Sequence, residues 1–224
     1  MRSRKRKKVL VIDVGGTHVK MLATGMRMRR EFDSGPMMTP RQMVSAAKKL
    51  TDDWEYDAVS IGYPGPVRHG RPSVEPWNLG RGWVGFDYRR AFRKPVRVLN
   101  DAAMQALGSY EGGHMLFIGL GTGMGSALVI GGQLQATEFA HMPFKHGKTF
   151  EDFVGLRGMQ RLGHHRWHKA VHEVVEILIA ALQVDYVVLG GGNARHVNPL
   201  PKHTRLGNNS HAFRGGFRIW EMKE

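Results

Sequence analysis

The sequence predicts an α/β protein built from two similar halves. Short apolar segments with the length of buried strands alternate with segments that have helical periodicity. One pattern, a strand followed by a glycine turn and a returning strand, occurs at residues 9–23 and again at residues 115–130. Several strands also end in glycine-rich turns, where backbone N–H groups are open to phosphate oxygens. These three observations favour a duplicated α/β architecture.

The composition is that of a folded protein with a surplus of positive charge. Of its 224 residues, 42% are hydrophobic, which is enough for a core. The formal net charge is +14, and part of it lies in the basic tail at residues 1–8. A surplus of this size favours an anionic partner, which can be nucleic acid, a nucleotide, a phosphorylated metabolite or a phosphate polymer. No zinc-finger or aromatic RNA-binding signature accompanies the basic residues, so we do not expect nucleic acid as the main partner.

The chain contains no cysteine, which excludes disulfides, thiolate zinc sites and a cysteine nucleophile. No apolar run approaches the roughly 20 residues of a membrane span. The apolar stretch behind the basic tail ends at Asp13 and is too short for the core of a signal peptide. We expect a cytoplasmic protein with no membrane partner.

Hydrophobic periodicity assigns most elements. We expect helices at 39–50, from 102 onward and at 167–182, and strands at 9–13, 19–23, 58–62, 96–99, 115–119, 126–130 and 186–189. Residues 67–87 are rich in Gly, Pro and Trp and predict a loop, while the last thirty residues have weak periodicity. We expect a tail at 1–8, an N-terminal α/β lobe at 9–101 and a C-terminal α/β lobe at 102–224. A return of the last segment to the first lobe is left open.

Three glycine turns follow buried strands, at residues 15–17, 121–125 and 190–192. Each alone could serve hairpin geometry only. The dinucleotide fingerprint fails because Met124 stands where it requires glycine, and a P-loop ending at Thr149 fails because Met142 stands at its first glycine.

The combination of motifs is more specific than any one turn. It comprises Asp13-Val14-Gly15-Gly16-Thr17, Pro64-Gly65-Pro66-Val67, Asn100-Asp101-Ala102, Gly119 to Ser126, Thr137 to His141 and Val188 to Gly192, with the stretch from Asn78 to Gly85 in support. In this order the motifs resemble the sugar kinases of the ROK family (repressors, open reading frames, kinases) in the actin and hexokinase superfamily. The polyphosphate glucokinase-like branch is the most similar.

The resemblance implies a two-lobed actin-like ATPase (ribonuclease H-like) fold with a central cleft. It also implies Mg²⁺-dependent phosphoryl transfer from polyphosphate, ATP or both to the 6-hydroxyl of glucose. Asp101 is then the general base that takes the proton of the sugar hydroxyl. Judged without the resemblance, Asp101 would be the N-cap of a helix.

The remaining site residues follow from the same resemblance. The implied sugar ligands are Asn100, Asp101, Glu138, His141 and Glu151. The implied phosphate or nucleotide ligands are Asp13, Gly15, Gly16, Thr17, Gly121, Thr122, Gly123, Gly190, Gly191 and Gly192. Asp13 would also hold Mg²⁺ through water. Taken without the resemblance, Glu151 starts a surface helix and Asp13 stabilises a turn.

Departures from the family pattern leave the acceptor sugar open. The cysteine-rich zinc motif is absent, so no zinc is implied. Ala140 and Ala103 replace residues that the family usually has, glycine before the sugar-binding His141 and Asn or Asp after Asn-Asp-Ala. The alternatives are a kinase for mannose or an N-acetylhexosamine, or a non-catalytic sugar-sensing member of the family. Against a repressor, we expect too little chain before the first strand for a DNA-binding helix-turn-helix. The resemblance also implies a homodimer.

One motif stands outside the resemblance. His164, His168 and His172 recur every four residues and share one face of a helix. This spacing suits a metal, but no nearby carboxylate completes a ligand set, and we expect a solvated basic face.

Overall fold

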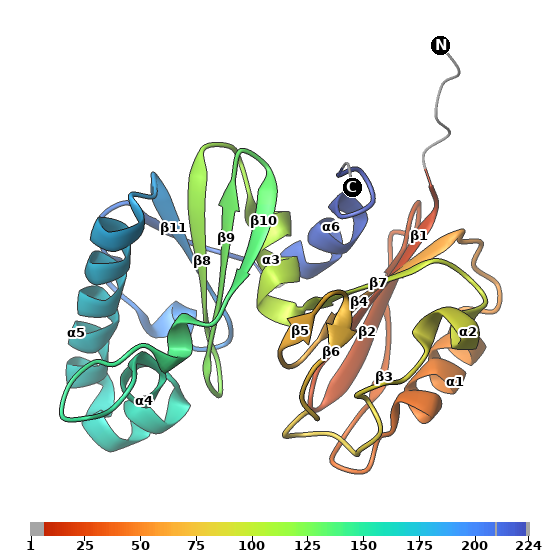
Figure 1. Ribbon diagram of the computed structural model, residues 1–224, viewed down its shortest axis with the longest axis horizontal. Helices are drawn as coiled ribbons and strands as arrows, with labels where there is room; N and C mark the ends of the chain where they lie inside the picture. Colours follow the sequence, from red (N-terminus) through yellow and green to blue (C-terminus); the bar gives the residue numbers. More distant parts are fainter. Residues whose placement is uncertain (1–6, 209, 223–224) are drawn as a thin grey trace. The chain divides into compact units, whose positions relative to one another are not determined.

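The structure is a computed structural model that describes residues 7–208 and 210–222 (Figure 1). The chain forms two compact units. The first comprises the chain up to Met104 together with the segment from Ala212 onward, and the second comprises Gln105–His211. Each unit contains one five-stranded sheet with mixed strand directions and helices packed on it, so the predicted α/β class is confirmed.

The sheet of the first unit has the order β3-β2-β1-β4-β7. Its strands are β1 (Val9–Val14), β2 (His18–Ala23), β3 (Arg30–Asp33), β4 (Ala58–Tyr63) and β7 (Val96–Asn100). The pairs β1·β2 and β2·β3 are antiparallel, whereas β1·β4 and β4·β7 are parallel. The central strands β1 and β4 are almost wholly buried, because helices cover both faces of the sheet.

Helices α1 (Pro40–Leu50) and α2 (Tyr88–Phe92) cover one face of this sheet (Figure 1). Leu10 and Ile12 of β1 share a hydrophobic core with Met43 of α1. The C-terminal helix α6 (His211–Arg218) covers the other face, where Gly216 lies directly on Val11 of β1. The last segment of the chain therefore packs on the first unit.

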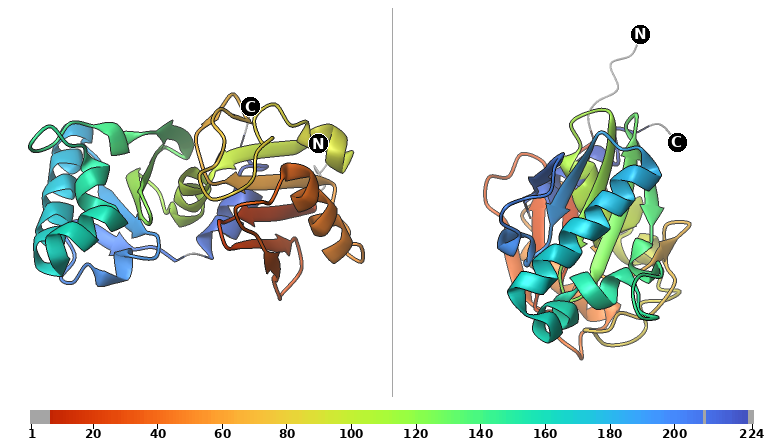
Figure 2. Two further views of the ribbon diagram at one scale, coloured as in Figure 1. Left: turned by 90° about the horizontal axis from the view of Figure 1, so that it is seen from below. Right: turned by 90° about the vertical axis from the view of Figure 1, so that its left-hand side faces the viewer.

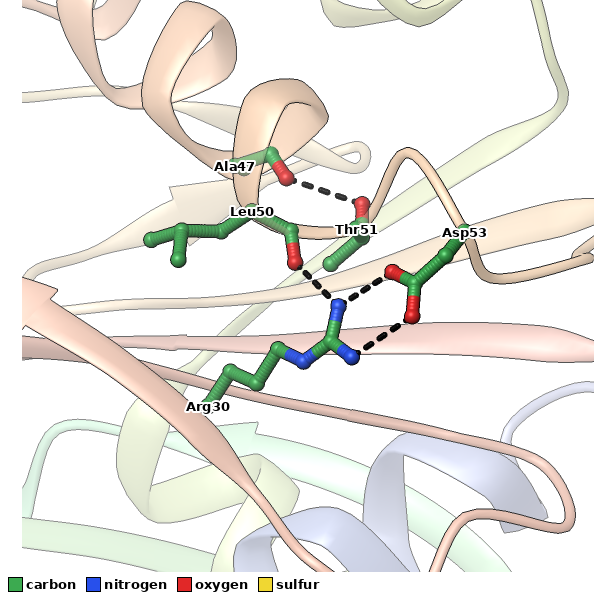
Figure 3. Close-up of polar contacts among 5 residues, drawn as sticks. All are labelled: Arg30, Ala47, Leu50, Thr51 and Asp53. Atoms are coloured by element: carbon green, nitrogen blue, oxygen red, sulfur yellow. Dashed lines mark hydrogen bonds and ion pairs between the residues drawn. The ribbon is translucent and has the colours of Figure 1, made fainter.

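Side chains fix both ends of α1. At its start Thr39 and Gln42 form a capping box. At its end the guanidinium of Arg30 donates to the carbonyl of Leu50 at 2.6 Å and pairs with both carboxylate oxygens of Asp53 (Figure 3). These contacts tie β3 to the end of α1, although the sequence pattern did not predict β3.

The sheet of the second unit has the order β10-β9-β8-β11-β12 and repeats the plan of the first. Its strands are β8 (His114–Leu120), β9 (Met124–Ile130), β10 (Gln133–Thr137), β11 (Tyr186–Gly190) and β12 (Thr204–Leu206). Three strands run antiparallel in series and two more pair in parallel, as in the first sheet. The predicted recurrence of strand, glycine turn and strand is confirmed.

Helices and short elements complete the second unit. Helix α5 (Leu156–Leu182) lies across its sheet (Figure 2) and packs on Leu116 and Ile118 of β8. Helix α3 (Asp101–Ser109) begins in the first unit and ends in the second. The short elements of the chain are α4 (Phe150–Val154), the hairpin β5 (Val67–Arg68) with β6 (Arg71–Pro72), and the single turns η1 (Phe139–His141) and η2 (Ala194–His196).

The predicted helix at 167–182 starts earlier than expected, at Leu156. Gly163 has φ of 74° and interrupts the helical geometry, which shifts the periodicity between the two parts of α5. Among the residues that the structure describes, no helix has both the length and the apolar character needed to cross a membrane.

Candidate functional site

The first glycine turn joins β1 to β2 and is closed by backbone contacts. The N–H of Gly15 donates to the carbonyl of His18 at 3.0 Å, and the hydroxyl of Ser34 donates to the carbonyl of Gly15 at 2.6 Å. A Cβ on Gly15 would lie 2.9 Å from the His18 carbonyl oxygen. Glycine is therefore required by the closeness of the backbone.

Asn78 lies against this turn, although the sequence pattern did not mark it as a site residue. A Cβ on Gly16 would lie 2.9 Å from Cβ of Asn78 and 3.3 Å from its Nδ2. The loop that carries Asn78 is held by Glu75, whose carboxylate accepts the N–H groups of Trp83 and Val84 at 3.1 and 3.2 Å. The resemblance in residues 78–85 was the signal that pointed to this loop.

Asp13 stands near the end of β1 and is half-buried. Burial raises its pKa, and the nearby Lys20 lowers it to a smaller extent. Within residues 7–208 and 210–222 no group donates a hydrogen bond to its carboxylate. A half-buried carboxylate without hydrogen-bond donors fits a cation, and Mg²⁺ prefers such oxygen ligands while keeping several waters.

Asn100 and Asp101 mark the passage from β7 to α3. Oδ1 of Asn100 accepts the N–H groups of Ala102 and Ala103 at 2.9 and 3.3 Å, and its Nδ2 donates to the carbonyl of Gly65 at 3.0 Å. Asn100 therefore caps α3, a role that the residues alone had assigned to Asp101. Oδ1 of Asp101, the first residue of the helix, accepts the N–H of Ala102 at 2.7 Å.

The second glycine turn joins β8 to β9 and is held by the start of α5. The N–H of Leu156 donates to the carbonyls of Gly121 and Thr122 at 3.1 and 3.2 Å. Oε2 of Glu151 accepts the N–H of Met124 at 3.0 Å and would lie 2.2 Å from a Cβ on Gly123. Glu151 thus lies at the turn itself, not merely at the start of a surface helix.

Glu138 and His141 lie close to Glu151 in the second unit. Glu138 is exposed, but desolvation by nearby protein atoms raises the pKa of its carboxyl, the neighbouring His141 lowers it, and the negative charge of Glu151 raises it. The chain is fixed here by Ser126, whose hydroxyl oxygen accepts the N–H of Phe139 at 3.1 Å. The structure therefore brings together three predicted sugar ligands: two carboxyl groups and one imidazole.

The third glycine turn follows β11 and is tied to the second turn by Asn193. A Cβ on Gly191 would lie 2.4 Å from the carbonyl oxygen of Leu120, and its φ is 82°. The backbone N–H of Asn193 donates to the Leu120 carbonyl at 2.9 Å, and its Nδ2 donates to the Gly121 carbonyl at 3.1 Å. Only its place directly after the glycine run marks Asn193 in the sequence.

The histidines of α5 fix a loop. Nε2 of His168 and Nε2 of His172 both lie 2.9 Å from the carbonyl oxygen of Pro199, and the ring centroids are 4.4 Å apart. The ring of His164 contacts that of His196 at 5.5 Å. No three described residues form a group that could hold a metal ion. The expected solvated face thus also anchors the loop after η2.

Comparison with known proteins identifies the family. The ROK family model matches residues 9–158. The polyphosphate glucokinase of Mycobacterium tuberculosis is 28% identical over 210 residues, covering 82% of this chain and 77% of that protein. The N-acetylmannosamine kinase of Escherichia fergusonii is 31% identical over 141 residues, covering 56% of this chain and 48% of that protein.

Solved structures show the same fold. The inorganic polyphosphate/ATP-glucomannokinase from Arthrobacter sp. strain KM has a TM-score of 0.79 at 20% identity, covering 95% of this chain and 98% of that chain. A ROK family glucokinase from Streptomyces griseus, in complex with glucose and AMPPNP, has a TM-score of 0.68 at 16% identity, with coverage of 95% and 98%. The predicted actin-like α/β fold is confirmed. Because the family model spans more than half of the chain, the protein belongs to the ROK family, and the two curated relatives named above are sugar kinases.

Proposed function

We propose that this protein is a glucokinase that transfers a phosphoryl group from inorganic polyphosphate, ATP or both to the 6-hydroxyl of glucose. The observation that carries the proposal is the arrangement at the start of α3. Asn100 supplies the helix cap through two accepted N–H groups. The carboxylate of Asp101 is therefore not required as the cap and is assigned the role of general base.

The acceptor sugar would be bound by five side chains. Neighbouring hydroxyls suit this set, because carboxylates accept hydrogen bonds and an amide or imidazole can also donate them. Oδ1 of Asn100 is already used by the helix, so its contribution to a sugar would come from the second hydrogen on Nδ2. The proposed ligands are Asn100, Asp101, Glu138, His141 and Glu151.

The transfer step moves one proton and one phosphoryl group. Asp101 accepts the proton of the 6-hydroxyl as that oxygen bonds to the terminal phosphorus of the donor. The bond from this phosphorus to its bridging oxygen breaks, and the electron pair leaves with the shortened polyphosphate or with ADP. Such reactions depend mainly on positioning and on stabilisation of negative charge.

The glycine turns would bind the donor. The N–H groups of Gly15 and Gly121 donate to carbonyls within their own turns. The other backbone N–H groups of residues 15–17 and 121–123 are proposed to contact phosphate oxygens, and residues 190–192 to contact the part of the donor beyond them. Asp13 would hold Mg²⁺, which neutralises phosphate charge when bound. Its half-buried carboxylate, which has no hydrogen-bond donor among the described residues and a pKa raised mainly by desolvation, supports this assignment.

Two observations support polyphosphate and glucose. The first is the relationship to the Mycobacterium tuberculosis polyphosphate glucokinase, which extends over 82% of this chain. The second is the net charge of +14, which favours a polyanionic donor. The 31% identity to an N-acetylmannosamine kinase supports a second candidate, a kinase for mannose or an N-acetylhexosamine.

A coupled assay of sugar 6-phosphate formation tests the proposal. Glucose, mannose and N-acetylmannosamine are each supplied with Mg²⁺ and either ATP or long-chain polyphosphate. Asp101→Asn should lower kcat by roughly 10²- to 10⁴-fold, the contribution typical of a general base. Asp52→Asn, which removes an exposed carboxylate elsewhere in the first unit, is the matched control.

Full activity of Asp101→Asn would contradict the mechanism. Product from another sugar but not from glucose would establish the second candidate. Sugar binding by a folded protein that forms no product with either donor would indicate a non-catalytic sugar sensor.

A further inference from the structure

Two basic segments of the chain, the second of which begins in the second unit and ends in the first, lack acidic residues. There is no Asp or Glu from Leu156 to His172, which covers the first half of α5, and none between Asp185 and Glu221. In a chain with 19 acidic residues, these stretches leave arginine, lysine and histidine without acidic neighbours in sequence. Such stretches concentrate positive potential, which attracts anions.

The two segments meet beside the third glycine turn. The ring of His164 on α5 lies 5.5 Å from that of His196 on η2. One helical turn further, His168 holds the carbonyl of Pro199 in the same loop. Only Asn193 separates η2 from the third turn at residues 190–192, and its side chain links that turn to Gly121. The contact between the two basic segments therefore lies next to the second and third glycine turns.

The segment after the third turn buries apolar side chains and exposes basic ones. Ala194, Val197 and Pro201 are buried, whereas Arg195 and His196 are exposed. A nucleobase is bound mainly by apolar and aromatic surfaces. These apolar residues are buried and are not exposed to such a ligand. A phosphate chain is bound by cations and hydrogen-bond donors. The segment exposes the guanidinium of Arg195 and the imidazole of His196, whose Nε2 accepts from Nε of Arg195 at 3.4 Å.

We propose that the exposed side chains of His164, Arg195 and His196 form a subsite for the part of a polyphosphate chain that extends beyond the glycine turns. The inference rests on the proposed function, because it requires the donor to lie along these turns. In polyphosphate, each further phosphate brings another negative charge to the subsite. ATP has only three phosphates, and beyond them it has a nucleoside, which is not an anion. The subsite therefore discriminates between the two donors.

Steady-state kinetics of Arg195→Ala/His196→Ala test the subsite. One hydrogen bond to a charged group contributes about 1.5–3 kcal/mol, so KM for long-chain polyphosphate should rise by roughly tenfold or more. KM for ATP and for the sugar should not change. Arg89→Ala, which removes an exposed arginine from α2 in the first unit, should leave all three values unchanged.

A binding experiment separates failure of the subsite from failure of the kinase. Labelled long-chain polyphosphate is titrated with the wild-type protein and with both variants in the absence of sugar, and binding is read by fluorescence anisotropy. Weaker binding by Arg195→Ala/His196→Ala alone supports the subsite, even if no sugar is phosphorylated. Equal binding by all three proteins overturns it, even if ATP supports full kinase activity.

Competition with single-stranded DNA addresses another polyanion. DNA at the same concentration of phosphate should displace the labelled polyphosphate poorly from the wild-type protein. Equal displacement by DNA would overturn the assignment and identify a nucleic-acid surface instead.

Discussion

At the scale of single residues, the structure explains why two glycine turns have no room for side chains. Asn78 lies against Gly16, and the carboxylate of Glu151 lies against Gly123. In both cases the neighbour is a polar side chain aimed at a turn proposed to hold phosphate. The absence of a Cβ thus lets a polar group lie against the backbone that would bind the donor.

Gly16→Ala tests the contact with Asn78. The added methyl group would lie 2.9 Å from Cβ of Asn78, so the turn or the loop must shift, and kcat should fall by about tenfold or more, since small misplacements of reacting groups are costly. Adding Asn78→Gly removes the opposing Cβ and should restore part of the loss. Adding Asn78→Ala keeps that Cβ and should not. Equal rescue by both second changes would show that the clash is not the cause.

The proposed role of Glu138 predicts that sugar binding depends on pH. Desolvation, as the largest cause, raises the pKa of this carboxyl above its ordinary range. As the pH falls through this raised pKa, the carboxylate gains a proton and loses acceptor capacity, so KM for the sugar should rise. KM measured between about pH 5 and pH 8 checks this, because an ordinary glutamate stays ionised over most of that range.

Glu138→Gln should have a higher KM that varies less over the same interval. Glu31→Gln, a change in β3 of the first unit, should keep the wild-type profile. A wild-type KM that is constant over the whole interval would refute a role for the Glu138 carboxylate in binding.

At the scale of elements, α6 is held on the first sheet by one buried hydroxyl. Ser60 of β4 donates to the carbonyl of Gly216 at 2.6 Å and accepts from Nε1 of Trp220 at 2.8 Å. Arg97 of β7 stacks on the ring of Trp220, with the guanidinium carbon 4.6 Å from the ring centroid. These contacts specify where the C-terminal segment attaches.

Ser60→Ala should lower the free energy of unfolding by about 1–3 kcal/mol, because it leaves buried polar groups without a partner. Urea unfolding followed by circular dichroism measures the change. Ser45→Ala, at an exposed position of α1, is the control and should leave stability unchanged or slightly increased, because alanine favours helix. A Ser60→Ala protein as stable as the wild type would show that the hydroxyl does not hold α6.

At the scale of the whole molecule, the two units have sheets of the same plan, and each supplies a different set of the proposed ligand residues. Asp13, Asn100 and Asp101 come from the first unit, and Glu138 comes from the second. The surplus of positive charge is carried by the chain as a whole. The homodimer and the cytoplasmic location stay predictions.

The net charge of +14 predicts a donor-specific effect of salt. Raising the concentration of NaCl from about 0.05 to 0.2 M should raise KM for long-chain polyphosphate by about tenfold or more, since several ionic contacts are screened together. KM for ATP, with its shorter phosphate chain, should rise less, and KM for the uncharged sugar should not change. Initial rates for each substrate at a series of salt concentrations measure this. Equal salt dependence for the two donors would argue against a polyanion-binding surface.

The sequence alone determined the α/β class, most long elements, the three glycine turns and the family. These features depend on local periodicity and on short motifs, which persist in a single chain whatever its tertiary contacts. It did not reveal the short elements β3, β10, β12 and α2, because exposed or brief segments leave little hydrophobic pattern. The helix α6 was not predicted either, because its two glycines weaken the helical pattern.

Only the tertiary structure decided which partners each site residue has. The cap of α3 falls on Asn100 because its amide reaches both the helix and the carbonyl of Gly65, a residue 35 positions earlier in the chain. Asn78 and Asn193 gain their places beside the glycine turns in the same way, through contacts between loops distant in sequence. The positions of such side chains depend on how the sheets bring loops together, and no pattern within one segment encodes that.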